Sequence, residues 1–419
     1  MLHRVDPPPL RRRSVLAIAV AGHAIEWYEF AIYGIVAAYI AAAIFPTDDL
    51  TVSLLATWTA YAVAFAFRPL GGIVIAHVAD RAGRGRALFL SVLLMSLATT
   101  LMAIVPGWEA AGLFAPVAFS ALRALQGFAV GGEMSSAVCF TLERLPAAAR
   151  PRAAGVLAAG TFAASFVGSV VASVLVVTIT DEHMASWGWR ALFASAAPLG
   201  IIALVLRARA LEPRSTPADP GAPVRVVFRL HRAGVARFAG VVASYNVALS
   251  CAFGGYLNEM VLAGFTRGEA VRVNTATYAV LVVAILATSR LSTALGRRTT
   301  LTLGLGAVAV GCVAQTVLVR TGSITAAMIG GIAIAVPIGI LATPVYLALV
   351  DAFPREIRAT AGGLGFNIAA AVGSAVPALA LGLRALIGTE HGLGLILACA
   401  LTTSLLIIWR APGEGTSRA

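Results

Sequence analysis

The sequence contains no lysine, only four cysteines and few charged residues of either sign. Charged residues make up 12% of the chain, against roughly 25% in an ordinary soluble domain. The cysteines stand singly in apolar stretches, which excludes a disulfide framework or a clustered metal site. No G-x-S-x-G, H-E-x-x-H or phosphate-loop motif is present. We therefore expect no enzymatic activity, no metal and no bound cofactor.

What the sequence has instead is long apolar stretches. Hydrophobic residues make up 59% of the chain and the mean hydropathy is +0.89. A membrane-spanning helix needs roughly 20 mostly apolar residues, and twelve stretches meet this requirement. They lie near residues 14–40, 51–79, 87–105, 110–142, 153–180, 188–206, 235–262, 270–292, 299–319, 324–349, 359–385 and 392–410. The sequence thus predicts an all-α integral membrane protein with twelve transmembrane helices. The first stretch is too long and too acidic for a cleavable signal peptide.

The arginines are distributed unevenly between the predicted loops. The net charge is +12, yet 24 of the 31 arginines fall in the two terminal segments and the loops after even-numbered helices. The opposite loops have few, with Arg267, Arg272 and Arg320 the main exceptions. Positive charge collects on the cytoplasmic side of membrane proteins. This pattern predicts that both termini are cytoplasmic, and it assigns the basic character to topology and not to nucleic-acid binding.

Two loops occur twice along the chain. Glu143-x-x-Pro146-x-x-x-Arg150 is matched by Asp351-x-x-Pro354-x-x-x-Arg358, an offset of 208 residues. Asp80-Arg81-Ala-Gly83-Arg84 is echoed more weakly by Thr293-Ala-Leu-Gly296-Arg297, an offset of 213. These offsets predict two related six-helix bundles in the same orientation, with a substrate site between them near the middle of the membrane. The expected division is 1–206, a cytoplasmic linker at 207–236, and 237–419.

At these loops the sequence resembles the major facilitator superfamily. Four further strings are similar to its metabolite:proton symporter branch, which includes carriers of citrate, oxoglutarate, shikimate, and proline or betaine. They are Gly22-His-Ala-Ile-Glu26-Trp-Tyr-Glu29-Phe30, Arg68-Pro-Leu-Gly71, Arg123-Ala-Leu-Gln126-Gly127 through Glu133, and Trp187-Gly-Trp-Arg190. The chain departs from the pattern at Ala76, Gly85 and His23. The resemblance implies a monomeric secondary transporter of a bacterial inner membrane that moves a small organic acid or zwitterion by proton-coupled symport with alternating access. A proton-antiport exporter is the alternative, and these motifs do not name the substrate.

Ionisable residues in the first predicted helix are candidates for proton coupling. Ionisable groups inside a bilayer are rare and usually functional. His23, Glu26 and Glu29 follow one another at steps of three, and Tyr33 lies four residues further, so they share a helical face. Both glutamates lie near the middle of the helix, where a carboxylate can take up and release a proton during transport. The alternative is that they form permanent ion pairs with a neighbouring helix.

Two arginines near the middle of predicted helices are candidates for substrate binding. Arg123, with Gln126 one turn on, is our first choice to hold a substrate carboxylate, and Arg68 is the second. Alternatively, both arginines neutralise Glu26, Glu29 and Glu133 when no substrate is bound. In the second half we expect Asn246, Tyr278 and Asn367 to face the same cavity, as we do Tyr33 in the first.

Charged residues in the repeated loops are candidates for a cytoplasmic gate. In the resembling superfamily, such clusters close the cytoplasmic side when the carrier opens outward. We expect Glu143 to pair with Arg150 and Asp351 with Arg358, each across its own proline turn. The expected gate residues are Asp80, Arg81, Gly83, Arg84, Glu133, Glu143, Arg150, Asp351 and Arg358.

Overall fold

The apolar stretches form long helices in the computed structural model, which describes residues 12–82, 84–143, 145–209, 227, 231–354, 357–388 and 392–410. Every regular element in these ranges is helical. The first half contains α1 (Arg12–Ile44), α2 (Leu50–Ala82), α3 (Arg84–Met102), α4 (Trp108–Ala111), α5 (Phe114–Val130), α6 (Glu133–Glu143), η1 (Ala147–Ala149), α7 (Arg150–Thr178), α8 (Asp181–His183), η2 (Met184–Gly188), α9 (Trp189–Ala194) and α10 (Ala196–Arg209).

The second half repeats this pattern of long helices with short breaks. It contains α12 (Arg232–Ser250), η3 (Cys251–Gly255), α13 (Tyr256–Leu262), α14 (Arg267–Thr288), α15 (Leu291–Leu295), α16 (Arg297–Val319), α17 (Ile324–Asp351), α18 (Arg358–Ser374), α19 (Val376–Ile387) and α20 (Gly392–Arg410). Because α10 ends at Arg209 and α12 begins at Arg232, helix reaches into both ends of the range predicted for the linker. Most of that range lies outside the described residues.

The helices agree with the hydropathy pattern. Within the described ranges, ten helical stretches are long and apolar enough to cross a membrane. Two shorter apolar helices, Arg86–Met102 and Gly392–Ile408, coincide with the third and twelfth predicted spans. The adjoining helices α5 and α6, α12 to α13, and α18 and α19 each correspond to one predicted span, with ends that differ by a few residues.

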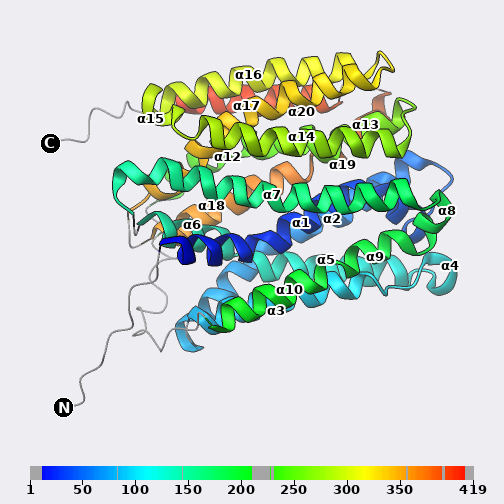
Figure 1. The fold of residues 1–419 in the computed structure, drawn as a ribbon, viewed down its shortest axis with the longest axis horizontal. Helices are drawn as coiled ribbons and strands as arrows, with labels where there is room; N and C mark the ends of the chain where they lie inside the picture. Colours follow the sequence, from blue (N-terminus) through cyan, green and yellow to red (C-terminus); the bar gives the residue numbers. More distant parts are fainter. Residues whose placement is uncertain are drawn as a thin grey trace.

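The helices run side by side, and their connections gather at two ends (Figure 1). Helices α6 and α15 lie toward one end, which we call the α6 end, and α4, α8 and α13 lie toward the other, the α8 end. The two halves meet where α2 contacts α18 and α19, and where α7 contacts α14 and α17. The candidate site described below lies along this meeting surface.

Helices α2 and α5 pack closely because glycines line their contact. A Cβ atom on Gly127 would overlap the carbonyl group of Ala64, and one on Gly71 would overlap that of Phe128. Small residues allow two helix backbones to approach in this way within a membrane. This contact matters for the site because α2 carries Arg68 and α5 carries Arg123.

Gly127→Ala is therefore expected to destabilise the protein by about 1–3 kcal/mol, the usual effect of overpacking. The added methyl group would push α5 away from α2 because backbone atoms cannot rotate aside. Gly306→Ala is the matched control, since nothing lies within 4 Å of a Cβ atom at Gly306 in α16. Thermal unfolding in detergent measures both variants. Equal stability of the two would contradict this account of the packing.

Candidate transport site

Glu26 of α1 and Arg68 of α2 form a buried ion pair. The Arg68 Nη2 atom lies 2.5 Å from Glu26 Oε1, and both side chains are almost fully buried. The guanidinium carbon of Arg68 lies 4.0 Å from the centre of the Phe65 ring, which adds a cation–π contact. Its Nε atom is buried without a hydrogen-bond partner. Arg68 therefore has a donor available to a further acceptor, such as a carboxylate that competes with Glu26.

Glu29 and Arg123 form a second buried pair, one turn further along α1. Arg123 Nη1 donates to Glu29 Oε1 at 2.6 Å and to Gln126 Oε1 at 2.5 Å. Gln126 in turn donates to Thr99 Oγ1 at 2.8 Å. The Arg123 guanidinium also lies over the rings of Tyr33, at 3.9 Å, and Tyr61, at 5.0 Å. Arg123 is thus held on several sides by groups of the first half.

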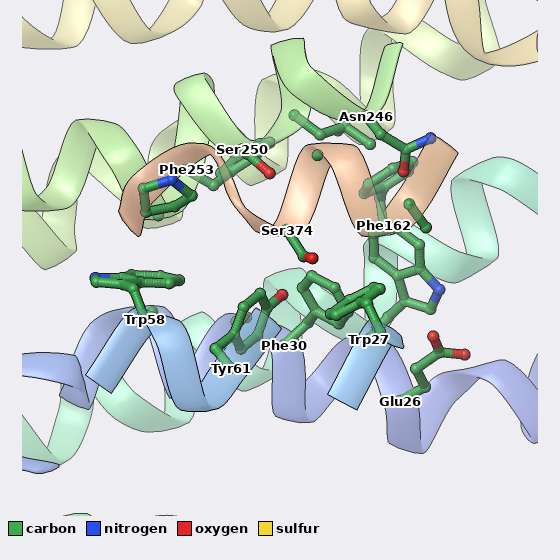
Figure 2. A pocket seen from close by; sticks show the side chains of 18 of the residues that line it. Glu26, Trp27, Phe30, Trp58, Tyr61, Phe162, Asn246, Ser250, Phe253 and Ser374 are labelled. Atoms are coloured by element: carbon green, nitrogen blue, oxygen red, sulfur yellow. The ribbon is translucent and has the colours of Figure 1, made fainter. Parts of the chain in front are cut away.

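A cavity of about 50 Å³ lies between the two halves, with room for a few water molecules. Nine aromatic side chains line it, five of them Trp27, Trp58, Tyr61, Phe253 and Tyr278. Figure 2 shows Trp58 and Phe253 toward one end of the cavity, and Glu26 with Trp27 toward the other. The Glu26–Arg68 pair is on the wall of this cavity. A guanidinium for a carboxylate and aromatic faces for an ammonium group suit a small molecule that carries both charges.

A π-helical turn, η3, shapes the end of the cavity near Trp58. Within it, Gly254 lies against the Trp58 indole so closely that a Cβ atom there would clash with the ring. The neighbouring Phe253 stacks on Tyr278, with ring centres 3.8 Å apart. Trp58 is 2% exposed, and its Nε1 atom has no hydrogen-bond partner. Trp58 therefore fills the contact between α2 and the second half.

The predicted substrate-binding residues divide into two groups. Arg68, Asn246 and Tyr278 line the cavity, as expected. The others do not belong to its wall: Arg123, Gln126, Tyr33 and Asn367. Tyr61 contacts both the cavity and Arg123, so its ring lies between them. Arg123 is absent from the cavity wall in this conformation, and its predicted binding role requires that side chains such as Tyr61 move.

Two of the remaining predicted residues have other partners. Tyr33 donates its hydroxyl to the carbonyl oxygen of Thr57 at 2.6 Å. Asn367 of α18 donates to the carbonyl oxygen of Gly131 at 2.6 Å, which links the second half to the junction of α5 and α6. Trp58, Phe253 and Asn274 line the cavity but were not among the predicted residues. Aromatic residues are common in apolar helices, so only Asn274, a polar residue in an apolar stretch, offered a signal.

The charged loops pair differently from the prediction. We expected Glu143 to pair with Arg150, but it accepts a hydrogen bond from Arg358 Nη1 at 2.6 Å, across the two halves. Asp351 lies 3.5 Å from Arg297, and not beside Arg358. The repeat is nevertheless visible, because Arg150 Nε donates to the carbonyl of Leu145 and Arg358 Nε to that of Phe353. Each arginine closes its own turn through the backbone, which leaves the carboxylates free to pair elsewhere.

A second ion pair joins the halves at the α8 end, where sequence reasoning found none. Arg267, at the start of α14, lies 3.5 Å from Asp181 of α8. Tyr39 of α1 donates its hydroxyl hydrogen to the Asp181 carboxylate at 2.6 Å. The Arg267 guanidinium lies 4.1 Å from the centre of the Tyr39 ring. Arg267 was noted only as an exception to the arginine distribution, and that exception was the available signal.

The remaining predicted residues belong to the first half. The side chains of His23, Asp80, Arg81 and Arg84, and Gly83 itself, lie outside the described residues. Glu133 is buried at the start of α6, with Ser91 Oγ 3.5 Å from its Oε2 atom. The roles predicted for these residues stay predictions.

The two cross-half ion pairs give a matched set of variants. Arg358→Gln is expected to loosen the α6 end, and Asp181→Asn the α8 end. Partly exposed pairs contribute about 0.2–1 kcal/mol each. The ratio of the open to the closed conformation at the affected end should therefore rise by about 1.4- to 5-fold. Hydrogen exchange of the backbone amides flanking each pair measures the change.

Asp351→Asn is the control, because the Asp351–Arg297 pair joins the neighbouring helices α16 and α17 and does not cross between the halves. It should leave exchange at the starts of α8 and α14 unchanged. Equal loosening of both ends in Arg358→Gln and Asp181→Asn would show that the two pairs are not separate latches.

Residues 20–378 match the sequence pattern of the Major Facilitator Superfamily. The chain belongs to the major facilitator superfamily. The prediction that the chain belongs to this superfamily is therefore confirmed. The family and the names of the relatives also indicate a transporter and not an enzyme, as predicted.

Two bacterial transporters have sequences similar to this chain. A glycine betaine/proline/ectoine/pipecolic acid transporter of Dickeya dadantii is 28% identical over 391 residues, which cover 88% of this chain and 77% of that protein. A proline/betaine transporter of Salmonella typhimurium is 35% identical over 206 residues, 49% of this chain and 41% of the relative. The second match therefore spans about half of this chain and less than half of the relative.

Solved structures of the superfamily share the whole fold. A D-xylose–proton symporter has a TM-score of 0.76 at 17% identity, covering 96% of this chain and 98% of that chain. The xylose transporter of E. coli, in a partially occluded inward-open conformation, has a TM-score of 0.75 at 15% identity, covering 97% of this chain and 99% of that chain. At such identities the likeness concerns the fold alone.

Proposed function

We propose that this transporter moves a small zwitterion, one that carries a carboxylate and an ammonium group, by symport with protons. The observation that carries the proposal is the Glu26–Arg68 pair on the wall of an aromatic cavity between the halves. Arginine binds carboxylates well, and aromatic faces bind ammonium groups through cation–π contacts, which do not depend on the charge of Glu26. The relatives named as betaine and proline transporters support the same substrate class.

Coupling follows from competition for Arg68. A substrate carboxylate that approaches Arg68 displaces Glu26 from it. Glu26 would then have lost the guanidinium that offsets its buried charge, which is strongly unfavourable. A proton on Glu26 removes that charge, so substrate and proton enter together. Release of both to the other side restores the ion pair and returns the carrier to its empty state.

The arginine distribution supports the membrane placement that we propose. Both termini, and with them the α6 end, would face the cytoplasm of a bacterial inner membrane. The Glu143–Arg358 pair would then close the cytoplasmic side and the Asp181–Arg267 pair the opposite side. We propose that the monomer is the transporting unit, since the cavity is formed within one chain.

Uptake into proteoliposomes tests the function. With an imposed pH gradient, acidic outside, we expect labelled glycine betaine or proline to accumulate and the medium to become more alkaline as it enters. Succinate, a dicarboxylate of similar size, is the comparison substrate and should be taken up poorly. Accumulation without proton movement would refute symport, and preference for succinate would refute the zwitterion assignment. Efflux driven by proton entry would indicate the antiport alternative.

A further inference from the structure

A groove outside the transport cavity lies between α7 and α14, on the surface where the two halves meet. Its volume is about 330 Å³. The residues that α7 contributes follow one helical face, and so do those of α14. The apolar ones include Phe166, Val170, Val174, Ala276 and Ala279. Val174 is 53% exposed, so the groove opens toward the surroundings of the bundle.

One charged residue, Arg272, lies in this apolar groove. It is exposed, and it stands five residues after the start of α14, about 7.5 Å along the helix axis. The carboxylate in the preceding turn, Glu269, accepts hydrogen bonds from the backbone and hydroxyl of Thr266 in a capping box. By contrast, Arg267 at the helix start has Asp181 as its partner. Glu269 attracts Arg272 without forming an ion pair with it, and Arg272 has no ion pair with any other residue in the described part of the chain.

An arginine beside an apolar surface near the end of the bundle attracts the anionic headgroups of the membrane surface. The groove runs from Arg272 to Ala279, about 10 Å along α14. It therefore combines a cationic site near the end of the bundle with an apolar channel that leads toward its middle. This combination matches a phospholipid, whose headgroup phosphate lies at the membrane surface and whose acyl chain lies below it.

We propose that this groove binds one phospholipid, with its phosphate on Arg272 and an acyl chain along α7 and α14. The lipid would come from the leaflet at the α8 end. The floor of the groove is closed by hydrogen bonds between the Thr275 hydroxyl and the hydroxyls of Ser169 and Ser173, at 2.7 and 2.8 Å, which join the halves. A lipid above this floor contacts both halves and stabilises their association at the α8 end.

Native mass spectrometry of the full-length, delipidated protein with added phosphatidylglycerol tests this proposal. Arg272→Gln is expected to weaken retention of one lipid by about fivefold, the effect of one arginine near a membrane surface. Ala276→Phe fills the apolar channel while keeping Arg272, and should weaken retention at least as much. Arg320→Gln removes an arginine from the end of a different helix, α16. This variant should retain the lipid as well as the unsubstituted protein does.

Each outcome decides the question independently of any transport substrate. Equal loss in Arg272→Gln and Arg320→Gln would show general attraction between charges and overturn the assignment. Unchanged retention in Ala276→Phe would place the lipid outside the groove. Displacement of the lipid by inorganic phosphate at equal concentration would reduce the groove to an anion site. Thermal unfolding of each variant confirms that the fold is kept before lipid is added.

Discussion

Glu26→Gln is expected to lower proton-driven accumulation of the substrate at least about 100-fold, while substrate exchange across the membrane continues. Glutamine has the shape of glutamate but carries no proton that can be released, and it leaves Arg68 available to the substrate carboxylate. A loss of this size corresponds to about 2.7 kcal/mol of coupling free energy. Accumulation under a pH gradient and counterflow without one, in the same proteoliposomes, measure the two activities separately.

Glu29→Gln is the matched control for this prediction. Glu29 lies one turn away on α1 and is equally buried, but it pairs with Arg123 and is absent from the cavity wall. We expect Glu29→Gln to retain coupled accumulation wherever the protein folds. If Glu26→Gln still accumulates substrate and Glu29→Gln does not, the proton site is Glu29 and the coupling step proposed above is wrong.

Arg123→Gln is expected to lower the free energy of unfolding by about 3–5 kcal/mol, because it leaves Glu29 buried without its charged partner. Arg123 is 1% exposed, so water cannot replace the guanidinium without rearrangement of Tyr33 and Tyr61. Replacing both members of the pair by glutamine removes the uncompensated charge. The double variant should therefore regain more than half of the lost stability.

Unfolding in detergent and equilibrium substrate binding distinguish this structural role from direct binding. A structural pair predicts a stability loss in Arg123→Gln that Glu29→Gln partly reverses. A substrate-binding arginine predicts a folded variant with weakened affinity that the second substitution does not restore. The latter result would support the role that the sequence suggested for Arg123 and would require Tyr61 to move during transport.

The positions of the helices were predictable because the membrane imposes a simple rule. Twenty or so apolar residues span the hydrocarbon, and the stretches that satisfy the rule coincide with the helices found. Glu26, Glu29, Arg68 and Arg123 were predictable as important because charge is scarce in such stretches. In each case the signal is a residue type in an unfavourable environment, which a single sequence shows directly.

The partners of these residues were not predictable, because they depend on how each helix is rotated about its axis. Arg68 faces the cavity and Arg123 is covered by Tyr61, although both lie near the middle of apolar helices. In the same way, the pairing of Glu143 with Arg358 depends on how the halves meet, whereas local spacing favoured Arg150. Asp181 and Arg267 are 86 positions apart in the sequence, and no local pattern connects them.

The close contact between Trp58 and Gly254 makes this tryptophan a built-in optical probe. Its indole is buried between the halves, so separation of the halves at that point would bring water to the ring and shift its fluorescence to longer wavelength. With the other five tryptophans replaced by phenylalanine, the emission of Trp58 would follow opening and closing in real time. The rates of the conformational cycle would then be measurable without an attached label.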